Sequence, residues 1–405
     1  MRAYSLFHPV CILTLLLLAA PSAWSQAAPS ALASAVYAAW QRSPHARTLE
    51  ARRDETLAGR DAAHTWIAGS PVLGLSQHSD RWTDGNGAQE TELSLAAPLW
   101  LPGQKAARQN LAASSADDLE AQIVLARWTI AGEVRERLWA VAAAREGLAE
   151  AEDHQHHLQG IADAVLRRVK AGDMARTDGM LAQQEVLAAQ GAVASAQVRV
   201  AEAMMRYRLL TGQSDIPQVD PEPPARTMTE PHPRSLAANA ALQRAQAGVK
   251  VTTAVRSDPP TVGLSMRQDR ERNTPSYSRS MGVAVQLPLG TNARNRPLET
   301  AARTHLATAS AEAAQLELSL RAEAEQARYQ LQNSREAYAA ASARAAMTRE
   351  HTALIDKAFR LGERALAELL RAEALSHEAE MAQGQQRVAV GLAHARLNQA
   401  LGIMP

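Results

Sequence analysis

Side chains that could bind a metal ion come together in the sequence at His154-Gln155-His156-His157. His154 and His157 are three residues apart and would share one face of a helix, and neutral imidazoles bind transition metals. Two interpretations are open: a weak metal contact, and a polar patch in mid-helix without a carboxylate cage. The polar patch is favoured, and His377 is interpreted as a packed histidine.

Enzyme chemistry is not indicated by the sequence. It has no nucleotide-binding loop, no G-x-S-x-G and no H-E-x-x-H, and its single cysteine, Cys11, lies in an apolar leader. Adjacent acids such as Asp117-Asp118 would point apart on a helix. The net charge of +1 gives no basic excess for neutralising phosphates. We therefore expect no enzyme, no cofactor and no nucleic-acid partner.

The first residues have the pattern of a signal peptide. Arg2 precedes an apolar run, CILTLLLLAA, that is too short to span a bilayer as a helix. Ala23-Trp24-Ser25 is a plausible cleavage site, so residues 1–25 are expected to be removed. The remaining chain would be exported, with no cysteine left for disulfides or metal sites.

The chain is a duplication with an offset of 190 residues. Gly172, Asp173 and Asp178 recur as Gly362, Glu363 and Glu368, and Pro98-Leu99 recurs as Pro288-Leu289. A duplication of this kind predicts one structural unit that is built twice. The predicted divisions are a signal peptide (1–25), a first repeat (26–216), a proline-rich linker (217–233) and a second repeat (234–405).

Each repeat is predicted to contain a helix, two strands and two long helices. Alternation of apolar and polar residues predicts strands over about 72–78, 91–99, 261–267 and 280–289. No proline interrupts the residues between Pro102 and Pro217, as extended helices require. The first of these helices would be roughly 100 Å long.

Gly172 and Gly362 are predicted to be the tips of two helical hairpins. Asp173 or Thr177 would cap the returning helix of the first hairpin. Each returning helix carries a stripe at four- and three-residue spacing, typical of a coiled-coil seam, with small residues that permit close packing. One hairpin cannot bury such stripes, so neighbouring hairpins are implied. The stripes are Met180, Gln184, Leu187, Gly191, Ala194, Val198, Ala201 and Met205, and Leu370, Ala374, His377, Met381, Gly384, Val388, Gly391 and Ala395.

Four strands with an apolar face cannot seal themselves, because lipid does not tolerate open sheet edges. Three chains would supply twelve strands, a number found in membrane barrels. Trp82, Trp100 and Tyr277 lie at strand ends, where an interfacial aromatic belt belongs. The predicted fold is mainly α with a small β part: a trimeric 12-stranded β-barrel in lipid, with twelve long helices around the same axis.

The sequence resembles the TolC-like outer-membrane efflux proteins over almost the whole mature chain. The resemblance rests on Ala97-Pro98-Leu99 and Leu287-Pro288-Leu289, the two tip glycines, and the terminal Leu210-Thr211-Gly212 and Ala400-Leu401-Gly402. The segment 358–372, AFRLGERALAELLRA, most resembles the cobalt–zinc–cadmium resistance branch.

The resemblance implies a passive outer-membrane duct of a tripartite efflux system. Its 12-stranded β-barrel would lie in the outer membrane and continue into a long periplasmic α-helical barrel. It implies a homotrimer that receives substrates, heavy-metal cations in this branch, from an inner-membrane pump of the resistance-nodulation-division type through a periplasmic adaptor (membrane fusion protein). The hairpin tips would dock the adaptor through Gly172, Asp173, Gly362 and Glu363.

The resemblance also places Asp178 and Glu368 at a pore gate, where a ring of carboxylates would concentrate cations. Arg371 would pair with Glu368 across the tip. A solvated helical face is the alternative interpretation of both acids. The alternative function is a soluble periplasmic coiled-coil adaptor or scaffold, which the two hairpins and the alternating strands disfavour.

Overall fold

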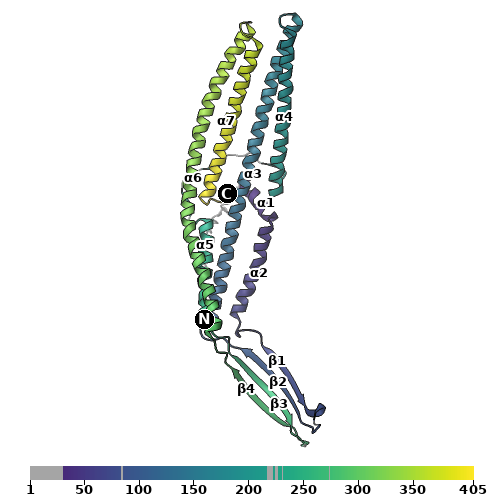
Figure 1. Cartoon of the computed structure of the whole chain (residues 1–405), viewed down its shortest axis with the longest axis vertical. Helices are drawn as coiled ribbons and strands as arrows, with labels where there is room; N and C mark the ends of the chain where they lie inside the picture. The colour runs from purple at the N-terminus through teal and green to yellow at the C-terminus, as the bar shows by residue number, and fades with distance from the viewer. Residues whose placement is uncertain (1–30, 84, 217–221, 224–226, 230, 273) are drawn as a thin grey trace, which may run out of the picture.

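The computed structural model describes residues 31–405 except 84, 217–221, 224–226, 230 and 273, so the predicted signal peptide lies outside the described residues. The molecule is long and narrow, with strands at one end and two helical tips at the other (Figure 1). The helices are α1 (Ala31–Arg42), α2 (Pro44–His64), α3 (Gln104–Ala171), α4 (Arg176–Thr211), α5 (Pro233–Ala254), α6 (Asn292–Arg360) and α7 (Leu366–Ala400).

The two repeats are visible as the same succession of elements. The first is α2, β1 (Val72–Ser79), β2 (Gln89–Pro98), α3 and α4, and the second is α5, β3 (Thr261–Arg270), β4 (Ser278–Gln286), α6 and α7. The helix preceding β1 is broken at Ser43, whose hydroxyl caps α2, with Pro44 at the first helical position. Strand β4 ends three residues earlier than predicted, because its last partner, Thr261, follows Pro260, which has no N–H to extend the ladder.

The first hairpin, α3 and α4, packs through a stripe that sequence reasoning did not select. The stripe predicted on α4 is exposed, with Met180 at 64% and Leu187 at 67%. The contact with α3 uses the neighbouring stripe, because this face turns its small and β-branched residues toward α3 and leaves the larger ones outside. The buried stripe is Gly179, Ala182, Val186, Ala189, Val193 and Ala196.

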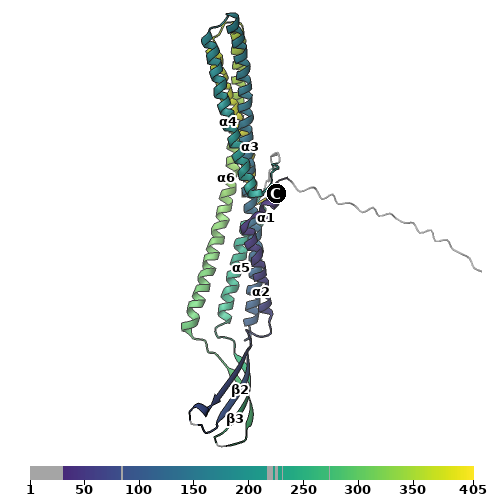
Figure 2. The ribbon, with the colours of Figure 1, turned by 90° about the vertical axis from the view of Figure 1, so that its right-hand side faces the viewer.

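In the second hairpin the predicted stripe is in contact with another hairpin, as expected. Gly384 and Gly391 of α7 face Glu146 and Trp139 of α3. Helix α5 lies between α3 and α6 and packs on both, so the two repeats form one body. The views in Figures 1 and 2 show the hairpins side by side along their length.

The four strands form one antiparallel sheet in the order β1-β2-β3-β4. Its register aligns side chains of one kind in rows across all four strands. One row is Leu75, Leu93, Met266 and Met281, and the next but one is Leu73, Leu95, Leu264 and Val283. The row between them is Gly74, Ser94, Ser265 and Gly282. The sheet therefore has one apolar and one small, polar face, and its edges β1 and β4 have one strand partner each.

The linker between the repeats is fastened to both of them. Arg135 of α3, only 2% exposed, forms a salt bridge of 2.7 Å with Glu222 of the linker. The same guanidinium donates to the carbonyl of Ile403, after α7, and the amide of Thr229 donates to the carbonyl of Leu401. The described part of the linker is thus held against the structure, although its proline content predicted only an extended connection.

We predict that Arg135→Ala lowers the free energy of unfolding by about 3–5 kcal/mol, because it leaves the Glu222 carboxylate partly buried and uncompensated. The measurement is denaturant unfolding followed by helical circular dichroism. Arg396→Ala is the matched control, since its bidentate pair with Glu136 is about half exposed on both sides and should cost about 1 kcal/mol or less. Equal losses in the two variants would contradict the assignment.

Candidate functional site

The two hairpin tips are built alike. Gly172 and Gly362 have φ of 85° and 79°, in the left-handed region that favours glycine. A Cβ at either position would meet nothing within 4 Å, so the glycine is required by backbone conformation and not by space. The amide after each glycine donates to the carbonyl five residues earlier, from Asp173 to Arg168 and from Glu363 to Ala358, both at 2.9 Å, as in a Schellman motif.

The returning helices are not capped as predicted. The residues at the N-caps are Ala175 and Ala365, without a side-chain cap, so Asp173 and Thr177 do not have the predicted role. The acids Asp178 and Glu368 instead occupy the first turns, where a carboxylate is stabilised by the helix dipole.

The candidate gate residues lie close to the tips, and their contacts within one chain can be stated. Glu368 accepts a hydrogen bond from Arg364 at 3.0 Å, one turn toward the tip, so the arginine that pairs with it here is Arg364 and not Arg371. Arg371 is exposed, and Asp178 is half-buried. Each pair of equivalent carboxylates is brought to the same end of the molecule by the two hairpins.

The tips are also joined to each other. The guanidinium of Arg168 on α3 lies 5.3 Å from the ring centre of Phe359 on α6 and donates to the Phe359 carbonyl. The same carbonyl also accepts a hydrogen bond from the amide of Gly362 at 3.0 Å, so Arg168 contacts the turn of the second tip as well as its aromatic ring. An apolar cluster below it includes Val165, Val186 and Leu369 from three helices. The two tips therefore form one unit within the chain.

Glycines set the distance between the hairpins. A Cβ at Gly391 would lie 1.9 Å from the ring of Trp139, which is buried. A Cβ at Gly384 would lie 2.6 Å from the carboxylate of Glu146, which Arg387 binds. The second neighbour is the end of a flexible side chain, whereas the first is a packed ring, so Gly391 is the stricter requirement.

The histidine segment lies in a cleft between the hairpins. His154 of α3 stacks on His377 of α7, with ring centres 3.8 Å apart and planes 6° from parallel. His157 Nε2 lies 2.9 Å from Glu373 Oε1, also on α7. Burial, then the neighbouring His377 and His157, lowers the pKa of His154 to about 4. His377 is thus packed as predicted, but the patch is not isolated, because α7 contributes a second pair of ligand-type side chains.

Carboxylates surround these imidazoles, contrary to the predicted absence of an acidic cage. The cleft has a volume of about 370 Å³ and is lined by five carboxylates and one arginine, Arg349. Arg349 is bound to Glu380 at 2.9 Å. Burial and the neighbouring acids raise the pKa of Glu150, as expected in a negative field. Sequence reasoning missed these acids because they come from three helices. Among the described residues, no three such side chains already surround a single point as metal ligands would.

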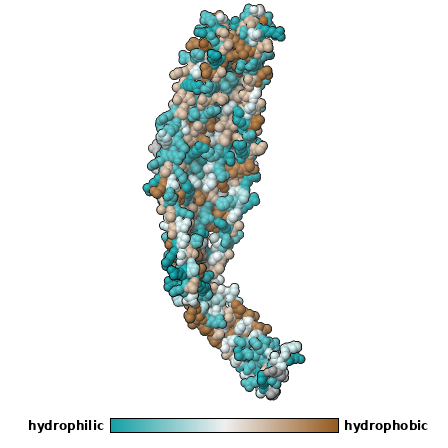
Figure 3. Space-filling model, viewed as in Figure 1, coloured by the Kyte–Doolittle hydropathy of each residue, from teal (hydrophilic) through white to brown (hydrophobic). Residues whose placement is uncertain are grey.

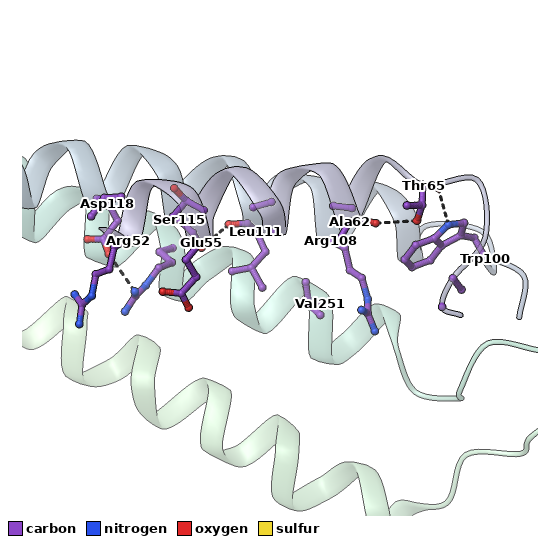
Figure 4. A pocket seen from close by; sticks show the side chains of 18 of the residues that line it. Arg52, Glu55, Ala62, Thr65, Trp100, Arg108, Leu111, Ser115, Asp118 and Val251 are labelled. Carbon is purple, nitrogen blue, oxygen red and sulfur yellow. Dashed lines mark hydrogen bonds and ion pairs between the residues drawn. The ribbon is translucent and has the colours of Figure 1, made fainter. Parts of the chain in front are cut away.

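A larger groove of about 990 Å³ lies where α2, α3 and α5 approach the sheet (Figure 4). At one end Trp100 donates to the carbonyl of Thr65 at 3.0 Å, with Arg108 over its ring. At the other end the buried Asp118 pairs with Arg244 at 3.1 Å. Its lining mixes charged and apolar side chains from the helices and from the segments that lead to the strands.

The sheet has no helix packed on either face in the described structure. Its apolar side chains are exposed, and Figure 3 shows hydrophobic residues on the sheet next to the helices and hydrophilic ones at its far end. A soluble protein rarely exposes a contiguous apolar surface of this kind unless the surface binds a partner or lipid. None of the described helices is long and apolar enough to cross a membrane.

Long paired hairpins on an uncovered four-stranded sheet are the fold of outer-membrane channels. The chain aligns over 92% of its length with the outer-membrane channel OprN (20% identity, 89% of that chain, TM-score 0.71). It aligns equally with the outer membrane protein VceC from Vibrio cholerae (17%, 96%, 0.70) and with the open state of the Neisseria gonorrhoeae channel MtrE (18%, 88%, 0.72). A search of curated proteins gives no match.

The second repeat is similar to a known protein family. Residues 230–403 match the model of the outer membrane efflux protein family. The family that this repeat matches is one of passive efflux channels and not of enzymes, and the fold shared with the solved channels extends over nearly all of the chain.

We predict that Gly391→Ala destabilises the contact between the hairpins by about 1–3 kcal/mol, because the added methyl overlaps the buried Trp139 ring. Gly147→Ala on α3 is the control: a Cβ there meets nothing within 4 Å, and alanine should add up to about 1 kcal/mol of helix stability. Thermal unfolding distinguishes them. The assignment fails if Gly391→Ala is as stable as the control.

Proposed function

We propose that the protein is the outer-membrane channel of a tripartite efflux system, assembled as a homotrimer. In this proposal residues 1–25 are the signal peptide, and two repeats, 26–216 and 234–405, are joined by the linker 217–233. Three copies together form a barrel of twelve strands in the outer membrane and a periplasmic tube of twelve long helices. One observation carries the proposal. The two repeats contact each other through one set of faces, and the faces that the duplication makes equivalent to these are uncovered on the outer sides of the chain.

The helices give the first support. Within the chain, the α7 stripe packs on α3, with Gly391 against Trp139. The offset of 190 residues relates Gly391 to Ala201 of the α4 stripe and Trp139 to Tyr329 of α6. The equivalent contact would therefore join α4 to α6, with Ala201 against Tyr329. Both of these faces are open in one chain, where Tyr329 is 69% exposed. Since α4 and α6 of one chain lie on opposite sides, the contact is made between neighbouring copies.

The sheet supports the same order of copies. The inner ladder pairs β2, the second strand of the first repeat, with β3, the first strand of the second repeat. The equivalent ladder joins β4 to β1 of the next copy, which removes both edges. A head-to-tail contact repeated in this way closes into a ring. Strands of 8–10 residues span about 27–33 Å, close to the roughly 30 Å of a hydrocarbon core.

At the far end, the six hairpin tips would meet around the axis. Gly172 and Gly362, with Asp173 and Glu363, would present the tips to a periplasmic adaptor. The first-turn acids Asp178 and Glu368 would form the gate and attract cations into the tube. Arg371 would be exposed beside them, while Arg364 holds Glu368 in the closed arrangement.

Heavy-metal cations are the substrates we propose, delivered by an inner-membrane pump of the resistance-nodulation-division type. The support is the tip segment 358–372, which resembles the cobalt–zinc–cadmium resistance branch. A soluble adaptor or scaffold is not favoured, because such a protein would expose the apolar rows of the sheet to water.

We predict that a chain carrying Ala201→Cys and Tyr329→Cys is linked by a short bismaleimide into dimers and trimers on a denaturing gel. The single natural cysteine, Cys11, lies in the predicted signal peptide, so the background is expected to be low. Ala201→Cys with Gln330→Cys is the matched control, because the next residue of α6 points about 100° away. Efficient linking of the control, or only monomers in both, would contradict the proposed contact.

We predict that a strain lacking the protein becomes more sensitive to zinc, cobalt or cadmium salts, and that the wild-type gene restores growth. Gly362→Val should restore it poorly while reaching the membrane in normal amount, because a β-branched residue is strained at φ of 79°. Gly248→Val on α5, where a Cβ has open space, is the control. If deletion leaves metal sensitivity unchanged, the substrate assignment is wrong.

A further inference from the structure

We propose that His154 and His157 of α3, with Glu373 and His377 of α7, form a transition-metal site that clamps the two hairpins together. The site is distinct from the duct: it lies in the wall between hairpins, and each chain would hold one ion.

The spacing on each helix is that of a chelating pair. His154 and His157 are three residues apart, and Glu373 and His377 are four apart, so each pair lies on one helix face. The two pairs face each other, as the ring stack and the 2.9 Å contact show. Two facing pairs supply four ligands, three imidazoles and a carboxylate, a set that suits Zn²⁺, Cu²⁺, Ni²⁺ or Co²⁺ and not Mg²⁺.

One pair of candidate ligand atoms is near the spacing that a metal ion needs, and the other two rings must turn to reach it. Two ligand atoms at about 2.1 Å from a tetrahedral ion are roughly 3.4 Å apart. The nitrogen of His157 and the oxygen of Glu373 are 2.9 Å apart. The centres of the stacked His154 and His377 rings are 3.8 Å apart, so these two side chains lie beside each other without their nitrogens meeting at one point. Without a metal ion, His154 stacks on His377 and His157 is bound to Glu373. Binding requires the His154 and His377 rings to turn toward the centre, and the proton shared by His157 and Glu373 to leave to solvent.

The surroundings favour a cation. Five carboxylates and one arginine line the cleft, and that arginine is already bound to Glu380. A divalent ion entering between the helices would reduce the mutual repulsion of these acids. Opposite-charge packing alone would not need three imidazoles at one place.

The duplication provides an internal comparison. At the equivalent positions of the open α4 and α6 faces stand Gln183 and Leu187, and Arg344 and Met347. In the proposed trimer, the contact between α4 of one copy and α6 of the next has the same geometry, yet it has no set of metal ligands. The seam therefore does not require histidine or glutamate for packing, and the ligand set belongs to the seam inside the chain alone.

The test measures Zn²⁺ binding to the full-length protein in detergent, after removal of any affinity tag, by calorimetry. We expect about one ion per chain. His154→Ala with His377→Ala should weaken binding by more than the roughly 10–100-fold cost of losing an outer-sphere partner. His156→Ala is the matched control: it is an exposed neighbour on the same helix that does not line the cleft, and it should bind as the wild type does. Zn²⁺ should also raise the unfolding temperature of the wild type and not of the double variant.

A second variant guards against misfolding. Glu373→Gln keeps the shape and a hydrogen-bonding group but removes the anionic ligand, and it should lose affinity with its helical circular dichroism unchanged. The inference is overturned if the wild type binds no Zn²⁺, or if His156→Ala loses as much affinity as the double variant. It does not depend on the exported substrate: binding is measured on purified protein, whereas the substrate is tested by growth of the deletion strain.

Discussion

In the proposed trimer, the structure depends on a contact that no single chain can complete. Each repeat presents one face to the other repeat, through the α3–α7 seam and the β2–β3 ladder, and leaves the equivalent faces of α4, α6, β1 and β4 uncovered. Because the repeats are related by duplication, the uncovered faces are complementary to each other: the face of α4 to that of α6, and the edge of β1 to that of β4. They lie on opposite sides of the chain, so they can meet only between two copies. The exposed apolar side chains on α4, α6 and the sheet are consistent with this constraint.

Close approach of the helices follows from small residues. Alanine and glycine line the seams on α4 and α7, so that Trp139 reaches the backbone of Gly391. Helices of 68 and 69 residues gain stability along their whole length from such contacts and need no bulky core. Stronger local fastenings occur at the ends: Arg168 on Phe359 at the tips, and Arg135 with Glu222 where the linker crosses.

Much of the fold could be predicted from the sequence, since glycine, proline and alternation have direct backbone consequences. The tips at Gly172 and Gly362 and the four strands are where those signals put them. The sequence predicted that the α4 stripe packs on neighbouring hairpins, and it did not identify the stripe of smaller residues that packs on α3, about a third of a turn away. The capping prediction failed because Ala175 takes the N-cap through backbone geometry, without a side-chain signal. The cleft around His157 was missed because its acids are distant in sequence.

The extended linker has a consequence for symmetry. In the first repeat, Val36 and Trp40 of α1 cover an apolar cluster that includes Val134, Val141 and Tyr207. At the equivalent place in the second repeat, Met228 of the linker packs on Ala324, Leu331 and Leu397. A tube of unfused single repeats would have six identical joints, and every substitution would act on all six. In the proposed trimer, fusing the repeats makes alternate joints different, so the joint inside the chain can carry His154 and Glu373 while the joint between copies carries other residues at the equivalent positions.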